Sequence, residues 1–433
     1  SGREWFGESF AIQKSYSFPF TFPNLITNEQ VHVRARVAAR TIGRSSEFSF
    51  AIGGNNVFDI AVGQVSSGYA SQYARVGSAT NDIFLNSGSF SVVANFNNPS
   101  TSDMGWLDYI EVVAKRRLQM VGNQMFFRNS DELAYNTVQY VLTYGNNDLS
   151  IWNVTDHNNA FAVTAQRSSN QFTFNGEGIG EIDEYVAFRN TDFLVPTLHG
   201  RVTNQNLHAL TQAEYIMVVH PMFMTQARQL ADFHESHYGY DVKIVSVFQV
   251  YNEFSGGNQD ITAIKDFVKM FYDRAGNDDA KMPKYLLLFG DASYDYKDFV
   301  SGNSNMIPSY QSQNSIEPVR SYVSDDYFGF LDDSESDGLT SSLDVGIGRF
   351  PVKTTTEANN VVQKVIKYHQ KPDVLQPWRS WLTFVGDDED GRIHMRNADE
   401  LAIQVQNKYA NYNLRKIYFD AYPQQTTAAG QRY

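Results

Sequence analysis

Two adjacent acids, Asp325 and Asp326, stand out among the residues of this chain that could do chemistry. They precede the aromatic run YFGF and lie in a long segment without helical periodicity. A carboxylate in such a segment could orient and charge-stabilise a catalytic histidine, as the third member of a triad does. The residues alone favour a solvated acidic loop or an Asx turn over that role.

Other acidic positions admit structural or metal-binding interpretations. Asp291 follows an apolar strand and a glycine, where it could cap a turn, bind substrate or ligate a metal; the turn is favoured. Two clusters, Asp332 to Asp337 (DDSESD) and Asp387 to Asp390 (DDED), are rich in the oxygens that Ca²⁺ prefers. Neither gives a complete calcium-loop pattern ending in Glu, so a solvated face is favoured. We expect that the protein requires no cofactor. Calcium binding is possible, but no sequence pattern supports it.

Histidine, serine and cysteine patterns argue against several familiar sites. His234 and His237 lie at i and i+3 in HESH, whereas the helical zinc motif needs i and i+4. His220 ends a predicted strand, and a single histidine in that place is usually structural. The strand-end sequence FGDAS does not fit the G-x-S-x-G elbow of serine hydrolases. The sequence has no cysteine, which excludes disulfides and thiolate metal sites, and nothing local supplies a nucleophile.

Residues 1 to about 205 have the pattern of an all-β region. Short runs such as Val31 to Val37 (VHVRARV) and Phe90 to Phe96 alternate polar and apolar residues, with Gly, Asn and Ser clusters between them. Period-two alternation with frequent turn residues predicts a sandwich. The stretch from Val138 to Phe188 is either the remainder of that sandwich or a small second β module.

From residue 210 to residue 433 the pattern changes to strands that alternate with helices. Tyr215 to His220 and Tyr285 to Phe289 are predicted buried strands, and the apolar stripe of Asp260 to Arg274 predicts a helix. Such alternation predicts a parallel sheet covered on both faces. Ligands and catalytic groups collect at the carboxyl ends of such strands, and the long segment Asp291 to Leu343 leaves one of these ends.

Composition limits the classes of function. A chain of 433 residues suggests two or three domains, and a net charge of −13 argues against a general nucleic-acid-binding role. No run approaches the roughly 18 apolar residues of a membrane span. The start, SGREWFGESF, has neither an initiator Met nor the basic end and apolar core of a signal peptide. We therefore expect a processed chain or a segment of a longer one.

The stretch from about Glu214 to Tyr433 resembles the first half of the catalytic domain of gingipain-type cysteine proteases. The pieces that carry this resemblance are EYIMVVHP, HYGYDVKIVSV, YNEFSGG with DITAIKDFVK, KYLLLFGDASYD, SDDYFGF, DVGIGRFPV and LTFVGDDED. YNEFSGG, GREWFGESF and GWLDYIEVV are similar to the sortase branch of this family, which serves type IX secretion. With these three pieces the resemblance extends over most of the chain.

The resemblance implies a caspase-like three-layer α/β sandwich, of which this chain holds the first subdomain after its β-rich region. The family's catalytic His, in a Gly-His-Gly setting, and its later Cys are expected beyond Tyr433. In the family, an acid in a Ser-Asp loop before a G-R-F strand supports that His. Ser324-Asp325 matches this place, so the resemblance assigns Asp325 as the orienting acid and Asp326 as the adjacent alternative.

The resemblance also implies a cell-surface cysteine endopeptidase and transpeptidase. Sortases of this branch remove the C-terminal sorting domains of secreted cargo and join the cargo to anionic lipopolysaccharide. They act at the extracellular face of the bacterial outer membrane, with the attachment-complex proteins PorV, PorQ and PorZ as partners. The gingipain preference for basic residues depends on an acid that the sequence does not locate, so that preference is not transferred.

Two other functions stay open. A non-enzymatic surface scaffold or adhesion protein could keep the gingipain-like fold without the chemistry, and a Gly-His-Gly and a Cys after Tyr433 would argue against it. A calcium-dependent carbohydrate-binding β module joined to an α/β scaffold is the third hypothesis. Titration of Ca²⁺ and glycans against residues 1–205 would test that hypothesis.

Overall fold

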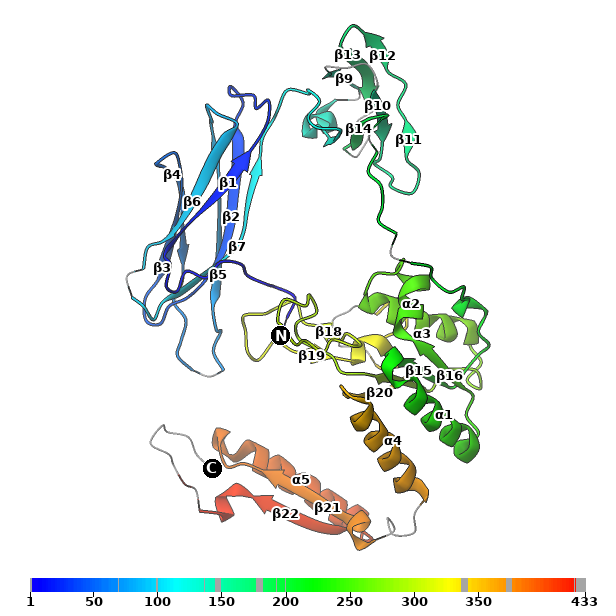
Figure 1. The fold of residues 1–433 in the computed structure, drawn as a ribbon. Helices are drawn as coiled ribbons and strands as arrows, with labels where there is room; N and C mark the ends of the chain where they lie inside the picture. The colour runs from blue at the N-terminus through cyan, green and yellow to red at the C-terminus, as the bar shows by residue number, and fades with distance from the viewer. Residues whose placement is uncertain are drawn as a thin grey trace. The chain divides into compact units, whose positions relative to one another are not determined.

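The chain consists of a β-rich region followed by an α/β region, as the sequence predicts (Figure 1). This computed structural model describes all residues except 1, 69, 99, 136, 145–148, 177–181, 192, 199, 336–341, 371–375, 424 and 426–433. Two compact units divide the chain: Ser1–Gln205 with Tyr310–Ser324, and Asn206–Ser309 with Asp325–Tyr433. The sequence did not reveal that Tyr310–Ser324 belongs to the first unit.

The first unit contains a two-sheet sandwich of antiparallel strands. One sheet has the order β1 (Ser15–Thr21), β6 (Ser89–Phe96), β3 (Ser46–Ile52), β4 (Asn55–Val62), and the other has the order β5 (Arg75–Ile83), β2 (Val31–Arg40), β7 (Met104–Val113).

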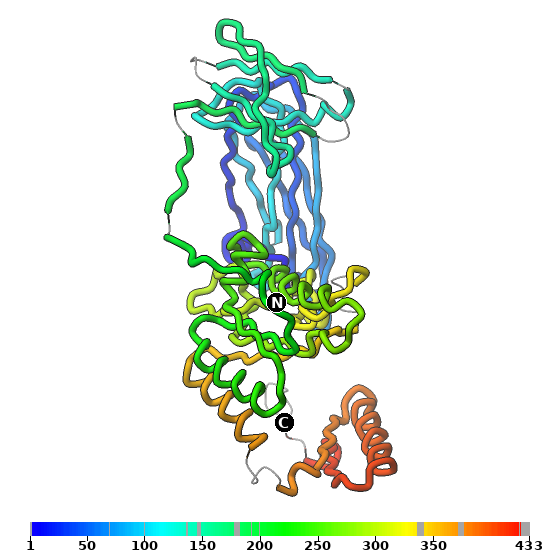
Figure 2. The backbone as a smooth tube through the Cα atoms, turned by 90° about the vertical axis from the view of Figure 1, so that its right-hand side faces the viewer, coloured from blue at the N-terminus to red at the C-terminus, as the bar shows by residue number. Residues whose placement is uncertain are grey.

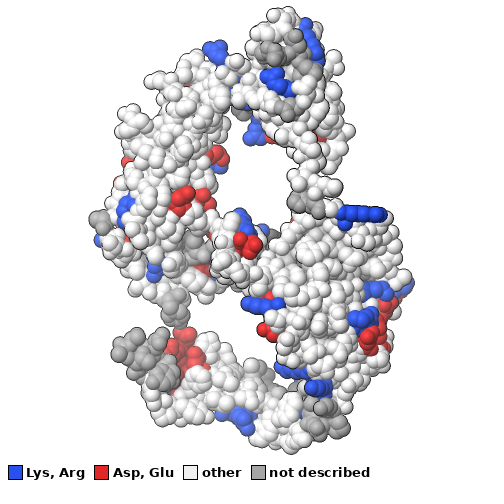
Figure 3. Space-filling model, in the orientation of Figure 1, with Lys and Arg blue, Asp and Glu red and all other residues white. Residues whose placement is uncertain are grey.

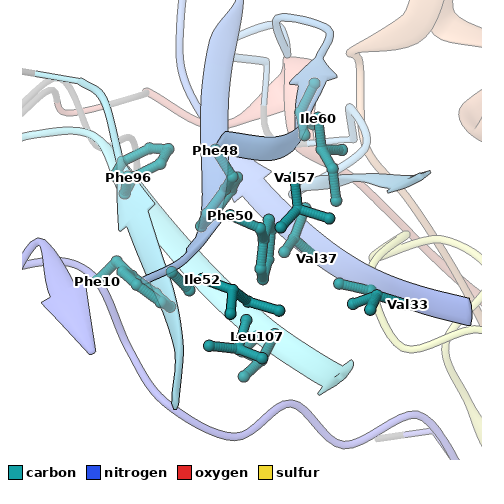
Figure 4. Close-up of a cluster of buried hydrophobic side chains, with 14 of the residues drawn as sticks. Phe10, Val33, Val37, Phe48, Phe50, Ile52, Val57, Ile60, Phe96 and Leu107 are labelled. Atoms are coloured by element: carbon teal, nitrogen blue, oxygen red, sulfur yellow. The ribbon is translucent and has the colours of Figure 1, made fainter. Parts of the chain in front are cut away.

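Alternate residues of both sheets form one apolar core in this sandwich. Val33 and Val37 of β2 are buried with Phe48 and Phe50 of β3, and Figure 4 shows these side chains together. A period of two places every second side chain on the same face of a strand, so the sequence pattern becomes a packed interior. Strand β5 was not among the predicted strands, because most of its residues (RVGSATNDI) are polar and exposed and give no apolar alternation.

A small second β module follows, which settles the choice that the sequence left open. Its sheets have the orders β11-β10-β14-β8 and β12-β13-β9, and it has a core of its own that includes Leu142, Leu149 and Phe172. The strands are β8 (Gln124–Phe127), β9 (Val138–Thr143), β10 (Leu149–Asn153), β11 (Phe161–Ala162), β12 (Gln166–Ser168), β13 (Gln171–Gly176) and β14 (Tyr185–Arg189).

The second unit is built on a four-stranded parallel sheet with the order β16-β15-β17-β20. Its strands are β15 (Tyr215–Val219), β16 (Val242–Ser246), β17 (Tyr285–Phe289) and β20 (Gly346–Phe350). Val219 and Phe289 on one face share a buried cluster with α1 (Met224–Tyr238) and α4 (Thr355–Gln370). The alternate residues Ile216 and Leu288 point to the opposite face and are fully buried.

Two further helices complete this three-layer arrangement. Helices α2 (Val247–Phe254) and α3 (Ile261–Ala275) pack on each other and lie on the sheet's other side from α1 and α4 (Figure 1). Asp260 caps α3 by accepting a hydrogen bond from the Thr262 amide at 2.8 Å. Helix α2 was not among the predicted helices, although Ser246 and Gln249 form the capping box that begins it.

A strand–helix–strand unit follows α4. Strands β21 (Trp381–Gly386) and β22 (Asn413–Tyr418) are parallel, and α5 (Ile393–Lys408) connects and packs on them. Figure 2 shows the backbone in a view turned by 90° from that of Figure 1. On the face drawn in Figure 3, the acidic and basic side chains form small separate groups. Among the described residues, no helix has the length and apolar character needed to cross a membrane.

Candidate active site

The carboxyl ends of β15, β17 and β20 lie at one edge of the parallel sheet. Val219, Phe289 and Phe350 occupy one row across these three strands, so the residues that follow them emerge together. His220 follows β15 and Gly290 follows β17. This is the edge at which the sequence predicts functional side chains to collect.

Arg349 and Asp325 form a bidentate ion pair at this edge. Arg349 Nε and Nη2 donate to Asp325 Oδ2 and Oδ1, each at 2.7 Å. The Arg349 side chain is 11% exposed and that of Asp325 is 25% exposed. A planar guanidinium that meets both oxygens of a carboxylate fixes the position and the plane of that carboxylate.

The same guanidinium also binds three backbone carbonyls of the long segment after β17. Arg349 Nη1 donates to Gly290 O at 2.9 Å and Ile307 O at 2.8 Å, and Nη2 donates to Pro308 O at 3.2 Å. The Arg349 side chain thus binds the start of this segment at Gly290, a later part of it at Ile307 and Pro308, and the carboxylate of Asp325. Chain segments far apart in sequence are thereby fixed around one group.

Gly290 permits the chain to turn sharply at the end of β17. Its φ of +156° is rarely adopted by other residues, and a Cβ there would lie 3.2 Å from both Met306 Cβ and Ile307 Cγ1. Asp291 follows it and stabilises the turn: its Oδ2 accepts a hydrogen bond from Ser304 Oγ at 2.6 Å and forms an ion pair with Lys353 Nζ at 3.2 Å. The turn interpretation of Asp291 therefore agrees with its contacts.

The histidines singled out in the sequence have packing or capping contacts. His220 Nδ1 accepts a hydrogen bond from the Met222 amide at 3.4 Å, and burial lowers the pKa of its imidazole. His234 and His237 lie on α1 among aromatic rings, and the His237 ring stacks on Phe233. These contacts account for the three rings without a role in chemistry.

Asp332, Glu335 and Asp344 bring oxygens within 4.8 Å of one another and are the one group among the described residues with this metal-ligand geometry. Their oxygens already accept protein hydrogen bonds: Asp332 Oδ1 from Tyr272 at 2.7 Å and Asp344 Oδ2 from the Leu331 amide at 2.9 Å. Asp337, the last acid of this predicted cluster, lies outside the described residues. In the second cluster, Asp390 pairs with His394 at 3.5 Å.

The structure places the two candidate acids differently. Asp325 faces Arg349, whereas Asp326 begins the short 3-10 helix η4 (Asp326–Gly329) and is exposed. Sequence reasoning did not single out Arg349. The signal was available in the run GIGRF, because an arginine inside a strand of a covered parallel sheet requires an acidic or carbonyl partner.

Comparisons with known proteins agree with this architecture. The model of peptidase family C25 matches residues 208–433. A crystal structure of dimeric latent PorU from Porphyromonas gingivalis is similar over 88% of this chain and 37% of the PorU chain, with 27% identity and a TM-score of 0.77. No curated protein sequence matches the chain.

Two gingipain structures are more distant. The complex of the RgpB pro- and mature domains from Porphyromonas gingivalis shares 19% identity, covers 47% of this chain and 42% of its own, and has a TM-score of 0.34. The Arg-specific cysteine proteinase gingipain R shares 17% identity over 50% of this chain and 43% of its own, with a TM-score of 0.33. These TM-scores are too low to support an argument.

The chain spans little more than a third of the PorU chain that it matches. Its β-rich region and the α/β region after it have the architecture that the sequence predicts, and PorU shares this fold over most of the chain. The family match extends over more than half of the residues. The chain therefore belongs to peptidase family C25 and is a PorU-like member of it.

Proposed function

We propose that this chain is part of a cysteine-dependent endopeptidase and transpeptidase, a sortase that removes C-terminal sorting domains from secreted cargo. The enzyme then attaches the cargo to anionic lipopolysaccharide. The observation that carries this proposal is the similarity to PorU, with 27% identity over 88% of the chain, which includes both the β-rich and the α/β regions.

The chemistry needs a thiolate and an imidazole. The thiolate must come from outside residues 1–433, because these residues include no cysteine. We assign the imidazole to the same outside segment, because the resemblance places the family's Gly-His-Gly histidine there. The thiolate attacks the carbonyl carbon of the scissile peptide bond and forms a C–S bond. The C–N bond then breaks, and the imidazolium protonates the leaving amine. An amine of the acceptor attacks the resulting thioester in place of water and loses a proton to the imidazole. The C–S bond breaks, the thiolate is released and the new amide is formed.

Asp325 is the residue of this chain that we assign to the catalytic machinery, as the acid that orients the histidine. Its two oxygens are held by Arg349, yet a carboxylate has about four lone-pair sites, so each oxygen can accept a further hydrogen bond. The bidentate contact would fix the carboxylate before an imidazole N–H reaches it. Asp326, exposed on η4, is the adjacent alternative.

The proposed site of action is the extracellular face of the bacterial outer membrane. PorV, PorQ and PorZ are the proposed partners, because the similarity to PorU suggests that the enzyme works with the same attachment-complex proteins. Co-purification of PorV with the enzyme from outer membranes tests this part. Recovery of the enzyme without PorV, PorQ or PorZ would contradict it.

Cleavage of a model cargo tests the activity. The enzyme that contains this chain is incubated with cargo carrying a sorting domain, and mass spectrometry identifies the new C-terminus and any amine joined to it. Asp325→Asn should lower the cleavage rate by about 10²- to 10⁴-fold, whereas Asp326→Asn and the α1 surface control Asp232→Asn should not. The reverse ranking of the two site variants would transfer the role to Asp326.

A non-enzymatic surface scaffold is the second candidate, and the lack of cysteine in all 433 residues favours it. Under this hypothesis the cargo stays intact in the assay above, while the protein still associates with surface components. Intact cargo after incubation with correctly folded full-length protein would therefore replace the sortase proposal with the scaffold.

A further inference from the structure

Glu132 is a fully buried acid in the small β module. It lies in the short 3-10 helix η1 (Ser130–Ala134). Its Oε2 accepts hydrogen bonds from the Tyr140 hydroxyl at 3.0 Å and from the Asp183 amide at 3.2 Å. Its Oε1 is also buried, but it has no hydrogen-bond partner among the described residues. A buried polar atom without a partner is costly, and more so when it carries charge, so the protonation state of Oε1 needs an explanation.

A second carboxyl group, that of Asp183, belongs to the same polar cluster. Asp183 Oδ2 accepts a hydrogen bond from the Tyr185 hydroxyl at 2.8 Å, and Oδ1 accepts one from Asn153 Nδ2 at 3.3 Å. Tyr140 and Tyr185 are themselves part of the buried core of the module. Two acids and two phenols, those of Glu132, Asp183, Tyr140 and Tyr185, therefore form one cluster, which we call the Glu132 cluster.

Among the described residues, no lysine or arginine pairs with either acid of this cluster. Arg128, four positions before Glu132, pairs with Glu184 at 2.6 Å. Lys115 pairs at 2.7 Å with Asp131, which precedes Glu132 in the chain. The positive charges near the cluster are therefore bound to other acids, and the two carboxyl groups are left without a cation.

Two neighbouring carboxyl groups without a cation favour retention of a proton. Burial raises the pKa of Glu132, and the negative charge of Asp183 raises it further. Burial also raises the pKa of both Tyr140 and Tyr185, and so do their hydrogen bonds to the two acids. Both phenols therefore stay protonated and act as donors, so the proton that relieves the repulsion is placed on Glu132.

Gly176 of β13 gives this proton an acceptor. A Cβ on Gly176 would overlap Glu132 Oε1 and would lie 2.6 Å from Tyr185 Oη, so both oxygens lie beside the same point. A small side-chain movement lets Oε1–H donate to Tyr185 Oη, whose own hydrogen is donated to Asp183 Oδ2. A protonated Glu132 would then have partners for both of its oxygens.

We propose that the Glu132 cluster is a pH-sensitive element of the β module: Glu132 keeps a proton in the folded module, and the module loses stability when this proton leaves. In the pH range between the ordinary pKa of a glutamate and the raised pKa of Glu132, only the folded chain keeps the proton. The free energy of unfolding of the module therefore falls as the pH rises through this range. An ion-paired carboxylate has the opposite effect, because its contribution grows with pH. The whole cluster lies within the first unit and is independent of the proposed sortase activity.

Hydrogen–deuterium exchange of the 433-residue chain at a series of pH values tests this proposal. Glu132→Gln replaces the protonated carboxyl by a neutral group of similar shape, which cannot ionise and still has an acceptor and a donor. The measured quantity is the exchange rate of the wild type divided by that of the variant at the same pH, because the intrinsic effect of pH on exchange cancels in this ratio.

In peptides that cover residues 138–143 and 185–189, this ratio should rise with pH. The rise should be about tenfold for each pH unit within the range in which only the folded chain keeps the proton. Glu184→Gln is the matched control, because Glu184 belongs to the same module but is 38% exposed and pairs with Arg128. The corresponding ratio for this control should not rise with pH.

A ratio for Glu132→Gln that stays constant or falls as the pH rises would overturn the proposal. So would slower exchange in the wild type, but not in Glu132→Gln, on addition of CaCl₂ at neutral pH, because a cation would then neutralise the two acids in place of a proton. Should Glu132→Gln fail to fold, carbon-13 NMR of the wild-type chain, labelled at its glutamate carboxyl groups, gives the answer. One signal should keep the chemical shift of a protonated carboxyl at a pH at which the others have become carboxylates, and a spectrum of carboxylates alone would refute the proposal.

Discussion

Replacement of Arg349 by Met tests the central contact of the candidate site. Met retains much of the apolar stem of the side chain but removes every donor. Asp325 would lose the partner of both its oxygens, and three carbonyl groups, of Gly290, Ile307 and Pro308, would each lose a donor. The loss of these contacts should therefore destabilise β17, β20 and the two ends of the segment between them.

The size of this effect follows from burial and geometry. Two unit charges about 4 Å apart attract each other by about 4 kcal/mol at an effective dielectric constant of about 20. Arg349 is only 11% exposed, and removal of one partner from a buried pair typically costs about 3–5 kcal/mol. Arg228→Met is the control, because Arg228 pairs with Asp232 on the same unit but is 46% exposed, and such pairs contribute about 0–1 kcal/mol.

Native-state hydrogen exchange in increasing urea measures the free energy of opening of β17 and β20 directly, so a chain of two units need not unfold in one step. We expect Arg349→Met to lower this free energy by about 3–5 kcal/mol and Arg228→Met by less than about 1 kcal/mol. Equal, small effects of the two variants would refute the structural importance of the Arg349 cluster. Asp325→Asn should fall between them, because Asn keeps one acceptor oxygen.

Two further predictions concern α1 and α3. Burial, with smaller contributions from His369 and His237, lowers the pKa of His234 to about 4. The imidazole of His234 takes up a proton near pH 6.5 in the unfolded chain but only near pH 4 in the folded one. The free energy of unfolding should therefore fall by about 1–3 kcal/mol between pH 6.5 and pH 4. In urea titrations His234→Phe should make this fall smaller, and a fall as large as that of the wild type would contradict the prediction. Asp260→Ala should cost about 1 kcal/mol by removing the cap on the Thr262 amide, and a urea midpoint equal to that of the wild type would show that the cap is dispensable.

Local patterns in the sequence were sufficient for most secondary structure. The period of two in VHVRARV became β2, and the helical stripe after Asp260 became α3. Gly239 ends α1 with a φ of 72°, as its position after the predicted helix suggested. The strand is indicated by side-chain periodicity, and the helices also depend on hydrogen bonds between residues at most four apart; a linear pattern records both.

The resemblance to gingipain-type proteases predicts that Asp325 is the orienting acid, but neither the resemblance nor the local pattern indicated its partner. Arg349 is 24 residues away, and its other acceptors are up to 59 residues away. A charged side chain inside an apolar strand shows that a partner is needed. Which carboxylate supplies it depends on how the segment after β17 returns to the sheet.

The sequence by itself determined the two kinds of fold and most of their strands and helices, because these follow from periodicity and chain direction. Tertiary structure alone decided that Tyr310–Ser324 packs with the first unit. The hydrogen bonds from Gly2, Arg3 and Glu4 to this segment join residues about 310 positions apart. Polar residues and a glycine carry no periodic signal, so their pairing becomes visible only when the folded chain brings them into contact.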